Sequence, residues 1–227
     1  MRRIAISDVH GCCKTFIRLL EKQVNLTPKD ELYLLGDYID RGPDSKGVLD
    51  YIFWLKEQGY FVKCLLGNHE DMMLKSIQLR NWRRSWLANG GIETLQSFKV
   101  KHPADIPEKY ILFLDELPYY HLVDKFILVH AGLNFKKGDP LNDPESMLWI
   151  RRWYGELDHT WLAERMIIHG HTTTGIPVIE DMNSNLDKLP VQNIDAGCYK
   201  VLSIDKGHLC AYDMTNNMLY FQRNIDF

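Results

Sequence analysis

The sequence contains no long apolar run. None of its hydrophobic stretches approaches the roughly 20 residues that a membrane-spanning helix needs. The amino terminus is basic, but its apolar run ends at Asp8 and is far shorter than the core of a signal peptide. We therefore expect neither a membrane partner nor a cleaved leader.

Cysteine is scarce and odd in number. The five cysteines lie mostly in apolar segments and lack the spacing of a zinc knuckle: Cys12, Cys13, Cys64, Cys198 and Cys210. This pattern argues against a disulfide framework and favours reduced thiols. We expect a cytoplasmic protein.

A strong excess of charge is also absent. The formal net charge is -3 at pH 7 and the sequence pI is about 6.3. No global positive field favours nucleic acid as a partner. An anionic substrate must therefore be attracted locally, by metal ions or a few arginines. With 227 residues, 45% of them hydrophobic, the chain can bury the core of one domain, which we place at 1–227.

The first 80 residues alternate strand and helix signals. Buried strands are predicted at 3–7, 31–35 and 61–66, and amphipathic helices follow them at 12–24, after Ser45 and at 70–79. This βαβαβ order predicts an α/β fold with a parallel sheet and right-handed crossovers.

The later chain is less regular. Residues 80–123 are rich in Trp, Arg and Tyr and are predicted to form a mostly helical cap. Two apolar runs follow at 126–129 and 166–168. From about residue 178, short alternating segments separated by turns predict antiparallel strands.

Five apolar runs end in polar residues of similar chemistry. In chain order these are Asp8 with His10, Asp37 with Asp40, Asn68 with His69, His130, and His171. The carboxyl ends of strands in α/β sheets open toward the ligand-binding crevice. Carboxylate, amide and imidazole groups are ligands for divalent cations, and one carboxylate can bridge two such ions. Each residue alone could be a strand-end cap, but five together indicate a two-metal phosphoesterase site.

These motifs resemble those of the metallophosphoesterases, specifically the bacterial and phage PPP-type serine/threonine protein phosphatases. The resemblance runs from Ile4 to about Gly197, and residues 86–91 resemble the lambda-phage branch. It implies a β-sandwich flanked by helices. It also implies two divalent ions, Mn in the first place, with Fe or Zn also compatible. The implied ligands are Asp8, His10 and Asp37 for the first ion, and Asp37, Asn68, His130 and His171 for the second.

The resemblance also implies a mechanism. A water molecule bridging the two metals would attack phosphorus in line. His69 would be the general acid, oriented by Asp40. His69 could instead be a further ligand or a hydrogen-bonded support. His169 is expected to be structural, and Cys12 and Cys13 are expected to pack rather than react.

Two arginines are candidates for binding the substrate phosphate. Arg41 follows Asp40 directly, and Arg151 lies in a Trp-x-Arg element, although Arg152 or a solvated basic turn remains an alternative. We expect hydrolysis of a phosphoprotein or phosphopeptide, because Asp40 favours the protein phosphatases. The alternatives are a symmetrical dinucleoside tetraphosphate hydrolase and a phosphate-binding regulatory module without catalysis.

Overall fold

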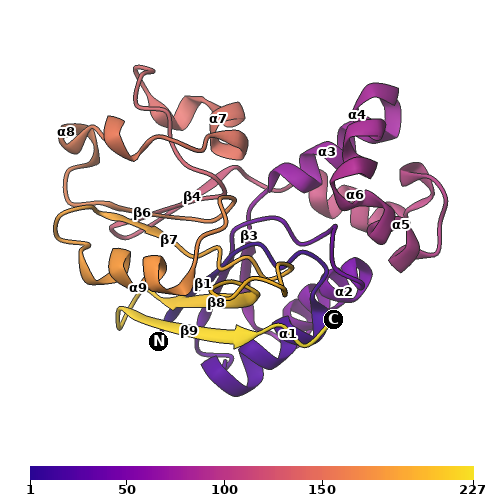
Figure 1. Ribbon diagram of the computed structural model, residues 1–227, viewed down its shortest axis with the longest axis horizontal. Coiled ribbons are helices and arrows are strands. Elements are labelled where there is room, and N and C mark those ends of the chain that lie inside the picture. Colours follow the sequence, from indigo (N-terminus) through magenta and orange to yellow (C-terminus); the bar gives the residue numbers. More distant parts are fainter.

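Two β-sheets lie face to face in the computed structural model, which describes residues 1–227 (Figure 1). The strand order is β3-β2-β1-β8-β9 in the first sheet and β4-β5-β6-β7 in the second. The strands of the first sheet are β1 (Arg3–Ile6), β2 (Glu31–Leu34), β3 (Phe61–Cys64), β8 (His208–Asp213) and β9 (Met218–Arg223). Those of the second are β4 (Tyr120–Val123), β5 (Phe126–Val129), β6 (Met166–His169) and β7 (Val191–Asn193).

Parallel pairing dominates the centre of both sheets. Strands β1, β2 and β3 are parallel, as the βαβαβ order predicts, and so are β5, β6 and β7. Strands β8 and β9 form the predicted antiparallel pair at one edge. Both sheets therefore direct the carboxyl ends of several parallel strands into loops, where ligand-binding residues usually lie.

Helices cover the outer faces of both sheets and extend beyond the first sheet. The first half of the chain contains α1 (Cys13–Arg18), the π-helix η1 (Leu19–Val24), α2 (Ser45–Glu57) and α3 (Asn68–Gln78). The stretch that follows contains α4 (Arg80–Trp86), η2 (Leu87–Gly91), α5 (Ile92–Phe98), η3 (Pro103–Asp105) and α6 (Glu108–Asp115). The second half contains η4 (Pro140–Asn142), α7 (Pro144–Trp149), η5 (Tyr154–Glu156), α8 (His159–Leu162) and α9 (Ile176–Ser184).

Alternation along the strands creates the layers. In β1, Ile4 and Ile6 pack in the core beneath α1, α2 and α3, whereas Ala5 packs between the sheets. In β5, Leu128 faces the first sheet, and Ile127 packs under α7 and α8. Successive side chains of a strand point to opposite faces, so the central strands of each sheet are buried on both sides. The predicted α/β sandwich flanked by helices is confirmed.

Three predictions differ from the structure. The region from about residue 178, expected to form antiparallel strands, begins within α9 and includes β7, which pairs parallel with β6. The helix expected over 12–24 is divided: α1 passes at Leu19 into the π-helix η1, which ends at Asn25 in a left-handed conformation. The region expected to be a mostly helical cap ends in β4, which pairs antiparallel with β5. The local sequence pattern does not predict this strand, because its hydrogen bonds come from the partner strand β5.

All five cysteines are buried and unpaired. No helix has the length and apolar character to cross a membrane.

The first prediction concerns Asp30, which joins the chain start to the turn before β2. Its carboxylate accepts hydrogen bonds from Arg2 and from the amide and hydroxyl of Thr27. The hydrogen bond from Arg2 lowers the pKa of Asp30. Because the folded-state pKa lies below the unfolded value, this stabilisation is present at neutral pH and is lost as the pH falls through the folded pKa.

We expect Asp30→Asn to lower the free energy of unfolding by about 2 kcal/mol at pH 7. The difference from wild type should shrink as the pH is lowered from 5 toward 2. Urea titrations at several pH values measure it. A difference that stays constant with pH would contradict the ionic origin of the effect.

Candidate functional site

The predicted site residues converge at the carboxyl ends of strands from both sheets. Asp8 and His10 follow β1, Asp37 follows β2, and Asn68 and His69 begin α3 directly after the loop from β3. From the second sheet, His130 follows β5 and His171 follows β6. All seven side chains are buried. The structure therefore brings together every residue that the sequence placed in the metal and acid positions.

The backbone at this site is unusual. Six residues other than glycine have positive φ angles here: Asp8, His10, Asp37, Asp40, Arg41 and His171. The left-handed region is sparsely populated by such residues and costs free energy, so outliers of this kind cluster at functional sites. The surrounding structure must therefore hold these loops in place.

Glu70 provides much of that support. Its carboxylate accepts hydrogen bonds from the amides of Asp37 and Tyr38, both at 2.8 Å, and from that of Gly67 at 3.1 Å. A further amide, that of Ile39, lies at 3.3 Å. Glu70 thereby fastens the loop that carries Asp37 to the start of α3. Glu70 was not among the site residues predicted from the sequence.

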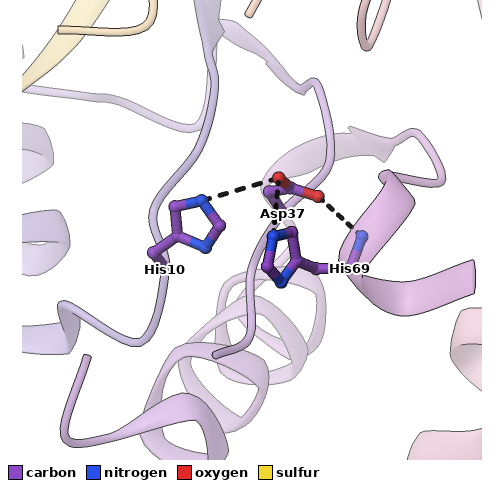
Figure 2. A group of neighbouring side chains, drawn as sticks. All are labelled: His10, Asp37 and His69. Carbon is purple, nitrogen blue, oxygen red and sulfur yellow. Dashed lines mark hydrogen bonds and ion pairs between the residues drawn. The ribbon is translucent and has the colours of Figure 1, made fainter. Parts of the chain in front are cut away.

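One oxygen of Asp37 faces the first group of nitrogens. Asp37 Oδ2 lies 3.5 Å from His10 Nε2 and 4.0 Å from His69 Nε2, and Figure 2 shows both imidazoles next to this oxygen of the carboxylate. His10 Nδ1 lies 3.0 Å from the carbonyl of Ile39. When Nδ1–H donates to that carbonyl, Nε2 carries a lone pair directed at the carboxylate.

The other oxygen of Asp37 faces the second group. Asp37 Oδ1 lies 3.5 Å from His130 Nε2. Asn68 Oδ1 lies 2.9 Å from His130 Nε2 and 2.9 Å from His171 Nδ1. His130 Nδ1 is 2.8 Å from the carbonyl of Leu35, which again favours the tautomer with a lone pair on Nε2. The carboxylate of Asp37 thus lies between two sets of ligand atoms.

These arrangements require positive charge. In the tautomers just described, imidazole lone pairs face carboxylate and amide oxygens, an arrangement that is repulsive unless a cation lies between them. Arg41 meets part of this need, because its Nη1 lies 2.6 Å from His10 Nε2. His171 Nε2 is buried without any partner. The residues therefore fit divalent cations, with Asp37 positioned to touch both.

Asp8 lies on the far side of the same centre. Its carboxylate accepts the amide hydrogen of His171, with donor–acceptor distances of 2.9 and 3.1 Å. Burial, together with the nearby charge of Asp37, raises the pKa of Asp8 to about 6. A buried carboxylate beside another carboxylate is stabilised by a bound cation, which favours the ionised form of both.

His69 and Asp40 form a closely coupled pair. His69 Nδ1 lies 2.6 Å from Asp40 Oδ2, which leaves His69 Nε2 directed toward Asp37. Burial lowers the pKa of His69 to about 4 and raises the pKa of Asp40 to about 8. Between these values the pair holds one titratable proton, which can lie on either side of the short hydrogen bond. A general acid needs such a proton that it can donate.

Asp40 is held by residues from the helical segment 80–98. Trp86 Nε1 donates to the Asp40 carboxylate at 2.9 Å, and Thr94 Oγ1 donates at 2.7 Å. Both side chains are fully buried. A side chain at Gly91 would meet the ring of Trp86 at 2.5 Å, so glycine is required there. The sequence did not predict that Trp86 and Thr94 hold the His69–Asp40 pair in place.

The two predicted arginines both reach the site. Arg41 contacts His10, as described, and its Cζ lies 4.4 Å from the ring centroid of Tyr199. Arg151 Nη1 lies 3.5 Å from the carbonyl of His171 and 3.5 Å from Thr172 Oγ1. The structure therefore directs Arg151 toward the metal-binding segment.

His169 and the first two cysteines make structural contacts. His169 belongs to β6, with Nε2 accepting from the hydroxyl of Tyr154 at 2.7 Å and Nδ1 next to the carbonyl of Gly170. Cys12 and Cys13 are buried, and burial raises the pKa of Cys13 to about 12. A thiolate at Cys13 is therefore strongly disfavoured.

Comparison with known proteins agrees with this geometry. The family model for calcineurin-like phosphoesterases matches residues 1–199. A curated relative, the asymmetrical bis(5'-nucleosyl)-tetraphosphatase PrpE of Geobacillus sp., is 27% identical over 217 residues, covering 80% of this chain and 83% of the relative. The symmetrical bis(5'-nucleosyl)-tetraphosphatase of Nitrosomonas europaea is 34% identical over 133 residues, covering 59% of this chain and 45% of the relative. The match to that of Buchnera aphidicola (strain Sg) covers 23% of the relative.

Solved structures support the fold. A serine/threonine phosphatase from Saccharomyces cerevisiae superimposes with a TM-score of 0.71 at 15% identity, covering 100% of this chain and 81% of the other. A structure provisionally assigned as a diadenosine tetraphosphatase gives 0.63 at 20% identity, covering 97% and 92%. At these identities the likeness speaks for the fold alone.

The expected phosphoprotein or phosphopeptide partner is wrong. The curated relatives are named for small dinucleotide substrates. The expectation depended on Asp40, which was taken to distinguish protein phosphatases. In the structure Asp40 is fully buried and contacts His69, Trp86 and Thr94. A buried residue that contacts His69 and not the surface of the site carries no information about what is attached to the phosphate.

The second prediction concerns metal content. Because the two oxygens of Asp37 face different ligand groups, Asp37→Asn should weaken both sites, since an amide offers a single neutral oxygen. We expect wild type to hold two divalent ions per chain after metal saturation and dialysis, and the variant to hold fewer than one. Elemental analysis of folded protein measures this. Retention of one full equivalent by the variant would show that Asp37 serves a single site.

Proposed function

The chain belongs to the calcineurin-like phosphoesterases and is a metal-dependent phosphoester hydrolase, and from this premise we propose that its substrate is a dinucleoside tetraphosphate. The observation that carries the chemistry is Asp37, whose two oxygens face two separate sets of metal-ligand atoms. The substrate class is supported by the curated relatives, among which one tetraphosphatase is matched over 83% of its length.

We propose two divalent cations per chain. The first would be held by Asp8, His10 and Asp37, and the second by Asp37, Asn68, His130 and His171. Such nitrogen and oxygen ligands accept Mn, Fe and Zn. When bound, the ions supply Lewis acidity and lower the pKa of a coordinated water molecule.

The surrounding side chains have complementary roles in this proposal. Arg41 and Arg151 bind oxygens of the phosphoryl group that reacts, since a guanidinium offers two parallel donors to such a group. His69 gives its Nε2 proton to the leaving oxygen, and Asp40 holds the ring through Nδ1. Hydrolysis of the tetraphosphate releases nucleotides. The terminal phosphate of a nucleotide is a better leaving group than the alkoxide of a phosphoserine.

We also propose that the chain works as one domain, with residues 80–123 acting as a cap that supports catalysis. Ligand atoms come from loops of both sheets, so neither sheet alone carries a complete site. The hydrogen bonds from Trp86 and Thr94 to Asp40 connect the helical part of the cap to the acid pair.

The retained side chains also argue against a regulatory module without catalysis. A phosphate-binding module needs its cations and arginines. It does not need a buried His69 that pairs with Asp40 and directs its Nε2 at the carboxylate of Asp37.

The third prediction compares substrates on the metal-loaded protein. We expect kcat/KM for a dinucleoside tetraphosphate to exceed that for a phosphoserine peptide and for nitrophenyl phosphate by at least roughly tenfold. The measurement uses initial rates on each substrate at one free metal concentration. If the phosphopeptide is the better substrate, the proposed substrate class is wrong. That result would not contradict the proposed metal site.

The fourth prediction separates proton donation from metal binding. His69→Asn should slow hydrolysis of an alkyl phosphate by about 10²–10⁴-fold, the usual contribution of a general acid. Nitrophenyl phosphate should lose much less, because its leaving group needs no proton. Metal content should stay close to that of wild type.

Steady-state rates on the two substrates and elemental analysis provide these three readouts. Equal losses on both substrates, or loss of one ion, would assign His69 to metal binding.

A further inference from the structure

The loop between β7 and β8 brings a lysine to the edge of the site. The amides of Lys200 and Gly207 both donate to the carbonyl of Gly197, at 2.8 and 3.1 Å, and the amide of Ile176 donates to the carbonyl of Asp205 at 2.9 Å. The first two bonds close residues 197–207, hereafter the 197–207 loop, on itself, and the third fastens this loop to the segment that follows His171. The backbone that carries Lys200 is therefore held in place.

Lys200 is positioned beside the metal-binding segment. Its Nζ donates to Thr173 Oγ1 at 2.9 Å, two residues after His171. The neighbouring residue, Thr172, is the one that Arg151 contacts. Arg151 and Lys200 thus reach successive residues of one segment from different parts of the chain.

Tyr199 connects this lysine to the other arginine. The ring of Tyr199 has Arg41 Cζ at 4.4 Å and Lys200 Nζ at 5.6 Å from its centroid, and His10 packs edge-on at 5.1 Å. Cations placed near an aromatic ring are attracted to its π electrons. The ring therefore holds two cations near each other that would otherwise repel.

These cations make no close ion pair. Eleven ion pairs occur in the protein, and none includes Arg41, Arg151, Lys200 or Lys206. Partial burial and the nearby charge of Lys206 lower the pKa of Lys200, and the charge of Asp195 opposes this shift. Arg41 also faces the buried carboxylates of the site. Cations without a close ion pair thus lie at the edge of the site in a chain of net charge -3, which favours binding of an anion there.

We propose that Lys200, steadied by Tyr199 and Thr173, binds a phosphate of the substrate chain beyond the phosphoryl group held by Arg41 and Arg151. The 197–207 loop then selects polyphosphates over monoesters. This inference rests on the proposed function, because a group of three cations suits a chain of linked phosphates better than a single phosphate. Lys200 is a specificity-determining residue in this account and takes no part in the chemical step.

The fifth prediction tests this selectivity with inorganic anions. Tripolyphosphate and orthophosphate are titrated as competitive inhibitors of nitrophenyl phosphate hydrolysis, with free metal held constant. In Lys200→Gln, the ratio of the inhibition constant for tripolyphosphate to that for orthophosphate should rise about tenfold, the loss expected for one charged hydrogen bond. Lys200→Arg should restore most of the wild-type ratio.

The matched control is Lys188→Gln. Lys188 precedes β7, whereas the site lies beyond the other end of that strand, and its Nζ contacts only Asn185 among hydrogen-bond partners. Lys188→Gln removes the same charge as Lys200→Gln, and the ratio of the two inhibition constants should not change. Calorimetric titration of the metal-free proteins with both anions should show the same selective loss of tripolyphosphate binding in Lys200→Gln. Competition of the anions for metal is then excluded as the cause.

The outcomes separate the two proposals. An unchanged inhibitor ratio in Lys200→Gln, or an equal rise in Lys188→Gln, overturns the role of Lys200. If wild type instead hydrolyses dinucleoside tetraphosphate poorly but Lys200→Gln still loses tripolyphosphate selectively, the proposed substrate is wrong and the polyphosphate-binding role stands.

Discussion

The carboxylate of Asp37 is the constraint on which the rest of the site depends. Its two oxygens face nitrogens on opposite sides, at 3.5 Å from His10 and 3.5 Å from His130. A buried group so placed is stable only if positive charge lies on both sides. The left-handed backbone at Asp37 and the amide hydrogen bonds accepted by Glu70 maintain that position.

The sandwich explains how distant residues meet at this carboxylate. Asp37 and Asn68 come from loops of the first sheet, and His130 and His171 come from loops of the second. The apolar core between the sheets, which includes Ala5 and Leu128, fixes their separation. Core packing between the sheets thus sets the positions of the ligand side chains. A close-packed interior is stiff, so a displacement in the core is transmitted to the loops that carry these side chains.

Local sequence predicted the strands, most helices and the ligand-bearing loops, because periodicity and strand-end motifs are short-range signals. It could not predict that Trp86 and Thr94 hold Asp40, or that Lys200 reaches Thr173, since these contacts join residues tens of positions apart. The substrate expectation failed for a related reason. Asp40 was taken as a marker of the protein phosphatases, whereas tertiary structure buries it behind His69, which it was expected to orient.

The central claim is that Asp37 is shared by two cations, and anomalous diffraction from crystals grown with Mn²⁺ tests it most directly. The account predicts two anomalous peaks about 3.5–4 Å apart, one on each side of the Asp37 carboxylate. One peak would lie beside His10 and the other beside His130. A single peak, or a second peak with no contact to Asp37, would contradict it.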